Sequence, residues 1–275
     1  MSEKLMATKK KKLTARNADK HWLYEQSVQA PEADTRFFAR YYKKLTGRNA
    51  RVMREDFCGT SQLSCHWVKL HRENRAIGVD LDASVLKWAR THNVSLLTED
   101  QRRRLRLIRN NVLAVRHPKA DVVAAMNFSY SVFQTRETLG AYIKNAYRSL
   151  NKHGVLCMDA WGGADTLITT VEKRRQQGFT YVWDQVDFDP ITFHILCKIH
   201  FEFRDGSRMR NAFIYDWRLW TLPEMQELMV EAGFKDVHVL WEGTERSTGE
   251  GNGAFRRTEK GGDEAAWIAY VVGKK

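Results

Sequence analysis

The chain has 275 residues, is 43% hydrophobic and carries a formal net charge of +12. This length supports a large core, as one domain or as one domain with an insertion. No apolar run approaches the ~20 residues that a membrane-spanning helix needs, and the lysine-rich start lacks the apolar core of a signal peptide. The four cysteines are scattered without a Cys-x-x-Cys pair, which indicates reduced thiols and no metal site. We therefore expect a cytoplasmic protein with no membrane partner.

Residues 1–18 form a basic segment that includes "ATKKKKLTAR". Its high charge and low hydrophobicity predict a disordered tail. Such a tail is able to touch nucleic acid or to act as a nuclear address, but a solvated terminus is the preferred interpretation. Residues 31–45 then have helical spacing with an aromatic face, which we interpret as core packing.

Short apolar strands alternate with amphipathic helices over the next hundred residues. The predicted strands are 51–57, 75–81, 104–111, 120–128 and 154–161, and the predicted helices are 61–71, 83–93 and 136–150. Asp82 is placed to cap the second of these helices. This alternation predicts a parallel sheet with helices on both faces.

The pattern changes at about residues 178–216, where three long strand-like runs follow one another. In the middle run, Ile195, Cys197 and Ile199 point to one side, while Lys198 and His200 point to the other. A period of two predicts an antiparallel flap with one buried face. We expect this flap to lie above the carboxyl ends of the sheet, because it follows the fifth strand directly.

A final helix, residues 222–234, and two strands, 236–243 and 265–273, complete the chain. Thr221 and Glu224 form the sequence pattern of a capping box. A Gly-rich connection joins the two strands. The expected fold is α/β: one domain over residues 19–275 with a Rossmann-like, mostly parallel sheet of seven strands and an inserted antiparallel flap.

The turn "EDFCGTS" after the first strand is where a nucleotide binds in many open sheets. A dinucleotide turn needs Gly-x-Gly-x-x-Gly, and a Walker-type loop needs Gly-Lys-Ser/Thr, and this chain has neither. Gly59 is the only glycine in the turn. The turn therefore suits a nucleoside ligand without phosphates, of which S-adenosylmethionine is the common one.

These residues resemble the first motif of the class I S-adenosylmethionine-dependent methyltransferases, and the resemblance covers roughly residues 50–272. Glu55, Gly59 and Thr60 match the motif, whereas Phe57 and Ser61 stand where the family has glycine. The stretch "REDFCGT" looks like that of a branch of uncharacterised bacterial-type members. The resemblance implies a Rossmann-like fold, S-adenosylmethionine as cofactor and methyl transfer as the activity.

The resemblance also implies which residues meet the cofactor. Asp80 ends the second strand, where a carboxylate accepts hydrogen bonds from the ribose hydroxyls. Asn111 stands where the family contacts adenine, and the N-terminal segment with Gln29 is expected to close over the ligand. The expected cofactor contacts are Tyr24, Arg54, Glu55, Phe57, Gly59, Thr60, Asp80, Leu81, Asn111, Val112, Asn127 and Phe128.

We expect the substrate pocket between the ends of the fourth and fifth strands and the end of the flap. The candidate catalytic residues are Asn127, Tyr130, Tyr215, Trp217 and Arg218, and the further candidate walls are Asp159, Trp161, Asp216, Trp220, Trp241, Glu242 and the 243–255 loop. Aromatic walls with carboxylates suit an amine, whereas Arg218 gripping a carboxylate would indicate an amino-acid-like substrate. An oxygen nucleophile would need a base, and only His200 or a carboxylate is on offer. N-methylation is therefore favoured slightly over O-methylation.

The leading hypothesis is thus a methyltransferase that acts on a small molecule by placing the nucleophile in line with the methyl group. The positive charge supports an RNA methyltransferase as an alternative, but beyond the tail the basic residues are interleaved with acidic ones, so nucleic acid ranks lower. The degenerate turn leaves open a catalytically silent protein that binds S-adenosylmethionine. The sequence leaves the oligomeric state open.

Overall fold

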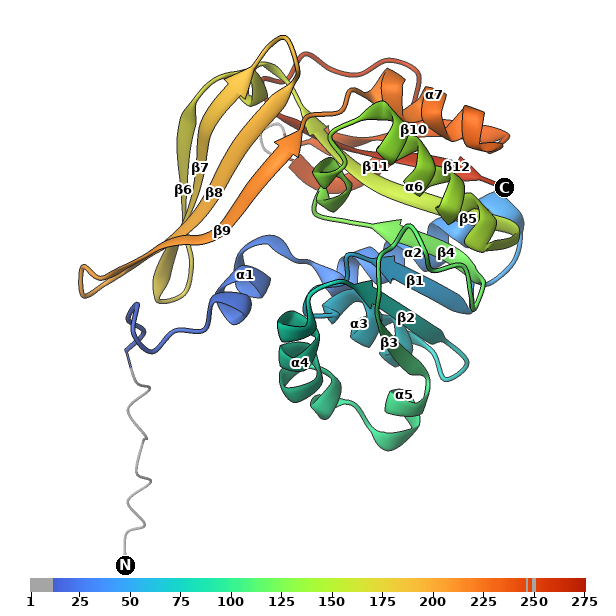
Figure 1. Cartoon of the computed structure of the whole chain (residues 1–275), viewed down its shortest axis with the longest axis horizontal. Coiled ribbons are helices and arrows are strands. Elements are labelled where there is room, and N and C mark those ends of the chain that lie inside the picture. The colour runs from blue at the N-terminus through green and yellow to red at the C-terminus, as the bar shows by residue number, and fades with distance from the viewer. Residues whose placement is uncertain (1–11, 246, 249–250) are drawn as a thin grey trace, which may run out of the picture.

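The computed structural model describes residues 12–245, 247–248 and 251–275 (Figure 1). Most of the expected tail, residues 1–11, lies outside the described residues. The rest of that segment contacts the antiparallel sheet: the Ala15 amide donates to Ser207 Oγ at 2.9 Å, and Leu13 packs on the apolar cluster that contains Phe201.

The central sheet has the strand order β11-β10-β12-β5-β4-β1-β2-β3. Strands β1 to β5 run parallel, and β12 is inserted antiparallel between β5 and β10. Their bounds are β1 Val52–Asp56, β2 Arg75–Asp80, β3 Leu105–Arg109, β4 Ala120–Ala125, β5 Leu150–Gly162, β10 Asp236–Thr244, β11 Gly251–Thr258 and β12 Trp267–Lys274. The mixed, mostly parallel sheet and the separate antiparallel sheet confirm the expected fold class.

The sheet has one strand more than the seven expected. Strand β11 comes from the Gly-rich segment that we expected to be only a connection, and it pairs antiparallel with the free edge of β10. Its sequence, "GNGAFRRT", has little apolar alternation, so its strand character comes from backbone hydrogen bonds to β10 rather than from side-chain burial.

Helices cover both faces of the central sheet. Residues of α6 and α7 share one buried cluster with the strands, and residues of α2 and α3 share another. The helix bounds are α1 Lys20–Val28, α2 Pro31–Thr46, α3 Gln62–Leu70, α4 Ala83–His92, α5 Glu99–Arg103, α6 Arg136–Ser149 and α7 Leu222–Ala232, with short 3₁₀ turns η1 Val94–Leu96, η2 Ser129–Val132 and η3 Ala164–Leu167. Over the described residues, none of these helices has the length and apolar character to cross a membrane.

The predicted helix caps are present. Asp82 accepts from the Ser84 amide at 2.7 Å where α4 begins. Thr221 and Glu224 form the capping box at the start of α7, and Gly233 closes that helix with a left-handed φ of 108°. Both ends of α7 are therefore set by local chemistry that the sequence displays.

The flap is a four-stranded antiparallel sheet in the order β6-β7-β8-β9. Its strands are β6 Thr170–Arg175, β7 Phe179–Asp189, β8 His194–Phe203 and β9 Arg208–Arg218. The first of these was not predicted, because "TVEKRR" is mostly charged and exposed. In β8 the predicted side is buried, from Ile195 to Phe203 at every second residue. This face packs on α1 and on Phe128 and Trp161, which belong to the ends of β4 and β5.

Candidate active site

The strand order reverses between β1 and β4, which lie side by side in the middle of the central sheet. In an open parallel sheet, such a reversal opens a crevice beyond the carboxyl ends of the strands. The residues that follow β1, β2, β3 and β4 therefore share one edge of the sheet. The flap stands beyond this edge (Figure 1).

The turn after β1 has an unusual backbone. Phe57, Gly59 and Ser61 all have left-handed φ angles, of 56°, 49° and 60°. The Gly59 amide donates to Asp80 Oδ2 at 2.8 Å, which ties the turn to the end of β2. A Cβ added to Gly59 would meet no atom within 4 Å, so the turn faces open space at this point. A ligand is therefore able to approach the backbone closely here.

The neighbouring groups fit a polar nucleoside. Asp80 has intermediate exposure. Within the described part of the chain its carboxylate accepts hydrogen bonds only from the backbone amides of Gly59 and Asp82, so lone pairs remain for ligand hydroxyls. The Asn110 amide donates to the Asp80 carbonyl at 3.0 Å, which brings Asn111 beside Asp80. Two hydroxyl oxygens of the turn, in Thr60 and Ser61, are enclosed by the protein and have no hydrogen-bond partner among the described residues. Leu81, directly after Asp80, is exposed and is open to a ligand.

Arg54, expected to contact the cofactor, lies elsewhere. Its side chain is fully buried and forms a two-pronged ion pair with Asp56, with Nε 2.6 Å from Oδ1. It also donates to the carbonyl oxygens of Val112 and Val115. Arg54 therefore fastens the segment after β3 to β1 and does not reach the open edge. Val112 itself is buried in the core.

Glu55 and Phe57 are also turned inward. Glu55 accepts from the amide and hydroxyl of Ser64 and so anchors the first turn of α3. Burial raises the pKa of Glu55 to about 8. The Phe57 ring packs against Phe133 and Tyr142. These two residues shape the turn, and Thr60 is buried as well, while Gly59, Asp80 and Asn111 remain accessible at the ligand side.

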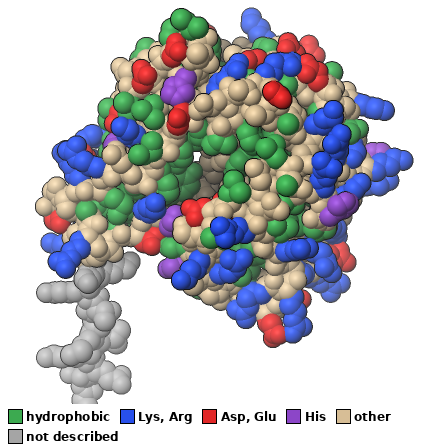
Figure 2. All heavy atoms as spheres, in the orientation of Figure 1, with side chains coloured by type: hydrophobic (Ala, Val, Ile, Leu, Met, Phe, Trp, Pro, Cys, Tyr) green, Lys and Arg blue, Asp and Glu red, His purple; other side chains and the backbone are tan. Residues whose placement is uncertain are grey.

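A cavity of about 690 Å³ lies between the flap and the sheet, and Figure 2 shows a hollow in this region with hydrophobic side chains at its border. It begins at Asn127 and Phe128, which follow β4, the strand next to β1 and its Gly59 turn. Ten aromatic side chains line it: Tyr24, Phe128, Trp161, Tyr181, Trp183, Tyr215, Trp217, Trp241, Trp267 and Tyr270. Among the described residues its charged lining is five carboxylates, Asp34, Asp159, Glu172, Glu242 and Glu264, and one guanidinium, Arg174. The size is that of a small-molecule site.

Three of the five candidate catalytic residues line this cavity: Asn127, Tyr215 and Trp217. The rings of Tyr215 and Trp217 stack on each other with centroids 4.3 Å apart, and each ring thereby limits the movement of the other. The expected walls Trp161, Trp241, Glu242 and Asp159 are also present in the lining.

Tyr130 and Arg218 do not line the cavity, so the structure corrects both predictions. Tyr130 is buried in η2, where its hydroxyl donates to the Asp159 carbonyl at 2.7 Å, because the 3₁₀ turn directs its ring into the core. Arg218 donates to Glu224 at 2.8 Å and lies 3.9 Å from the Trp220 ring centre. It therefore supports the start of α7 and is not free to grip a substrate carboxylate. Trp220 is itself a core residue.

Asp159 fixes the end of β4. Asn127 and Phe128 have left-handed φ angles of 57° and 56°, and their amides donate to the two Asp159 carboxylate oxygens at 2.6 and 3.0 Å. Burial nevertheless raises the pKa of Asp159 to about 7. These two amide–carboxylate hydrogen bonds hold the strained turn after β4, which lies between the Gly59 turn and the cavity.

Helix α1 lies between the flap and helices α3 and α4 (Figure 1) and contacts both sides. The Tyr24 ring packs against Phe213 of β9 in the flap, with ring centroids 5.0 Å apart. Glu25 accepts from Gln62 of α3 and from Asn93 at the end of α4. Tyr24 thus lines the cavity as predicted for the N-terminal segment, and the buried Gln29 side-chain oxygen has no hydrogen-bond partner.

His200, the histidine considered as a base, lies outside the cavity, as does His194 of the same strand. His200 is bonded to Asp184 at 3.1 Å and accepts from the Asn211 amide, and His194 is bonded to Asp216. Within the described lining, carboxylates are therefore the available bases. Asp34 and Tyr270 also line the cavity and were not predicted from the sequence. Asp34 is an acid in the first turn of α2, and Tyr270 is the one hydroxyl-bearing residue of β12, and neither feature by itself indicates a binding site.

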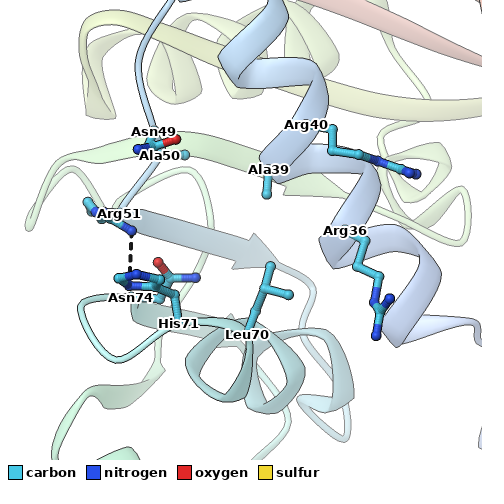
Figure 3. Close-up of a pocket in the computed structure, with 9 residues that line it drawn as sticks. All are labelled: Arg36, Ala39, Arg40, Asn49, Ala50, Arg51, Leu70, His71 and Asn74. Atoms are coloured by element: carbon cyan, nitrogen blue, oxygen red, sulfur yellow. Dashed lines mark hydrogen bonds between the residues drawn. The ribbon is translucent and has the colours of Figure 1, made fainter.

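A second hollow of about 430 Å³ lies at the opposite end of the strands (Figure 3). It is bordered by Arg36 and Arg40 of α2 and by Arg51 and His71, which approach each other to 3.1 Å. Arg51 precedes β1, so this hollow is at the amino ends of the strands and away from the Gly59 turn. The cavity under the flap is therefore the candidate site.

No protein-family model matches the sequence, and no curated protein matches it. Solved structures do. An S-adenosylmethionine-dependent methyltransferase from Clostridium acetobutylicum aligns over 92% of this chain and 96% of its own, with 15% identity and a TM-score of 0.65. An amino pentose methyltransferase, CalS10 from Micromonospora echinaspora, aligns over 93% and 96%, with 13% identity and a TM-score of 0.64. The sugar N-methyltransferase KedS8 from a Streptoalloteichus species aligns over 100% and 98%, with 16% identity and a TM-score of 0.62. At these identities, the chain shares the fold of these methyltransferases.

Proposed function

We propose that the protein is an S-adenosylmethionine-dependent methyltransferase that methylates a small molecule, with nitrogen as the favoured acceptor. One observation carries the proposal. Asn127 and Phe128 lie on the same sheet edge as Gly59, Asp80 and Asn111, and they line the aromatic cavity of about 690 Å³. A cofactor on that edge would present its reactive end to a substrate in the cavity.

The cofactor supplies an activated methyl group, and the residues of the edge would hold it. Asp80 would accept hydrogen bonds from the ribose hydroxyls, and the open backbone at Gly59 would admit the ligand closely. Asn111 is the candidate for the adenine amino group, and Tyr24 with Gln29 would cover the ligand from α1. The protein's task is then to bring the nucleophile into line.

The charge of the cavity supports a cationic substrate. Its described lining has five carboxylates against the single guanidinium of Arg174, and that group already lies 4.6 Å from the Tyr181 ring centre. Aromatic faces and carboxylates both attract an ammonium group and both oppose a phosphate backbone. Two of the similar structures are a sugar N-methyltransferase and an amino pentose methyltransferase, which agrees with an amine acceptor.

The placement of the bases also favours nitrogen. An alcohol needs a base for each turnover because its neutral oxygen is a weak nucleophile. His194 and His200 are engaged outside the cavity. An amine needs only to lose the proton of its ammonium form, and a carboxylate suffices for that.

The deciding experiment incubates the purified protein with S-adenosylmethionine labelled in its methyl group and a metabolite extract, followed by identification of labelled products. We expect a labelled N-methyl product. A labelled O-methyl product would overturn the choice of nitrogen, and a labelled RNA base would overturn the choice of a small molecule. Cofactor binding by calorimetry without any labelled product would favour the silent binding protein.

A further inference from the structure

We propose that Asp34 and Tyr270 are the amine-recognition pair of the cavity, and that Asp34 takes the proton of the bound ammonium group. This inference rests on the proposed function and deepens it. It assigns a primary or secondary amine as the substrate class and names the groups that hold the reacting nitrogen. Neither residue belongs to the motif that resembles methyltransferases.

The pair is assembled across almost the whole chain. Asp34 lies in the first turn of α2, and Tyr270 lies on β12, directly opposite Asp159 of β5 in the register. The Tyr270 hydroxyl donates to Asp34 Oδ1 at 3.4 Å. Both side chains line the cavity together with Asn127 and Phe128. The pair therefore faces the end of β4, where the methyl group would arrive.

The Asp34 carboxylate keeps free hydrogen-bonding capacity. Among the described residues its only bond to a side chain, from Tyr270, is long and therefore weak. Asp159, by contrast, already accepts hydrogen bonds from two backbone amides, and Glu242 accepts one from the Gly253 amide at 2.8 Å. A desolvated carboxylate with spare lone pairs in an aromatic cavity is a site for a cation with N–H donors.

Glu172 also lines the cavity but is exposed on strand β6 of the flap, which leaves Glu264 as the competing carboxylate. One of the Glu264 oxygens accepts from Thr244 at 3.0 Å, and the other is buried without a partner among the described residues. Glu264 lies in the connection before β12, beside the end of β10. Asp34 is preferred because Tyr270 lies in register with Asp159, which holds the turn at the end of β4.

The environment of Asp34 suits a proton acceptor. A carboxylate in the first turn of a helix is favoured in its charged form, yet burial outweighs this and raises the pKa of Asp34 to about 6. The same desolvation makes the approach of a positive charge more favourable than it would be at the surface. The Tyr270 hydroxyl orients the Asp34 carboxylate by donating a hydrogen bond to it, and no proton passes between the two groups.

The step balances as follows. The ammonium group gives one proton to Asp34 and becomes a neutral amine. The freed nitrogen lone pair forms the new N–C bond, while the C–S bond of the sulfonium breaks and its electron pair stays on sulfur. The product amine carries the positive charge, and the proton leaves Asp34 for water when the product departs. The total charge is the same before and after.

The test measures amine binding through the fluorescence of the tryptophans, five of which line the cavity. The probes are three amines with their neutral counterparts: benzylamine with benzyl alcohol, cyclohexylamine with cyclohexanol, and glucosamine with glucose. We expect at least one amine to bind more tightly than its neutral counterpart. The variant Asp34→Asn should raise the Kd for that amine about 10-fold or more, with little effect on the Kd for the neutral molecule, because it removes a charge-assisted hydrogen bond. Tyr270→Phe should raise the Kd for the amine about 3-fold, as expected for the loss of a neutral hydrogen bond.

Glu32→Gln is the matched control, since Glu32 is an exposed acid in the same helix turn, is paired with Arg36, and is not part of the cavity lining. It should leave every affinity unchanged. Equal binding of amines and neutral counterparts by the wild-type protein would overturn the inference. An unchanged amine affinity in a folded Asp34→Asn variant would also overturn it. The same holds if amine affinity falls in Glu264→Gln and not in Asp34→Asn. Circular dichroism establishes the folding of each variant.

Titration with S-adenosylmethionine separates this inference from the proposed function. Asp34→Asn should keep the wild-type affinity for the cofactor. If the wild-type protein binds amines but no cofactor, the proposed function fails and the recognition pair stands. If the wild-type protein binds the cofactor but Asp34→Asn leaves amine affinity unchanged, the inference about the recognition pair fails and the proposed function stands.

Discussion

Asp80 shows how one carboxylate organises the ligand side of the sheet edge. It holds the Gly59 amide at 2.8 Å and the Asp82 amide at 2.9 Å, so it joins the turn after β1 to the start of α4. Asp80→Ala removes these charge-assisted bonds and the proposed ribose contact, and we expect the Kd for S-adenosylmethionine to rise about 10-fold or more. Calorimetric titration measures this. An unchanged Kd in a variant with wild-type circular dichroism would remove Asp80 from the cofactor site.

Glu55 predicts a dependence of stability on pH. Burial raises its pKa from an ordinary 4.5 to about 8, so the folded chain binds this proton more tightly than the unfolded chain does. Its contribution to the free energy of unfolding is therefore full below pH 4.5 and declines as the pH rises to about 8. Glu55→Gln keeps a neutral side chain at every pH. Relative to this variant, we expect wild-type stability to fall across that window.

Urea unfolding of both proteins at several pH values checks this prediction. Asp34 and Asp159 also have raised pKa values, but both remain in the variant, so their own titrations cancel in the difference and only the repulsion between Asp34 and Glu55 is left. A constant difference between the two proteins from pH 4.5 to 8 would show that Glu55 titrates normally.

At the scale of elements, α1 depends on a shared hydrogen-bond centre. Asn93, which follows α4, donates to Glu25 of α1 at 2.7 Å and to the Thr60 carbonyl of the turn at 2.8 Å. Asn93→Ala leaves a buried carboxylate and a buried carbonyl without this donor, which should cost about 1–3 kcal/mol. We expect faster amide hydrogen exchange in α1 and weaker cofactor binding. Unchanged exchange across residues 20–28 would mean that the flap alone holds the helix.

At the scale of the whole molecule, the site is built from both sheets, so cofactor binding should stabilise the fold as a unit. A ligand that binds only the folded chain at 100 times its Kd adds about 2.7 kcal/mol to the free energy of unfolding. We therefore expect S-adenosylmethionine to raise the thermal midpoint of the wild-type protein and to raise that of Asp80→Ala far less at the same concentration. Equal shifts in both proteins would place the binding site away from Asp80.

The sequence by itself determined the features that neighbouring residues control. Helix α7 begins at its predicted capping box and ends at Gly233, and β8 buries the predicted side, because caps and alternation act over a few residues. It also placed Gly59 and Asp80 on successive strand ends, where parallel pairing brings them within hydrogen-bonding distance. The predicted fold class follows from the same alternation of strands and helices.

Only the tertiary structure decided which side chains enter the cavity. Tyr130 and Arg218 stand at predicted positions in the chain, yet a 3₁₀ turn and an ion pair with Glu224 draw them away from it. Asp34 and Tyr270, which are 236 positions apart, meet there because α2 and β12 begin at the same edge of the sheet. A strand end fixes where the backbone stops, but the direction of a side chain depends on packing partners that are remote in sequence. For that reason the edge that would hold the cofactor was visible in the sequence, and the walls that would select the substrate were visible only in part.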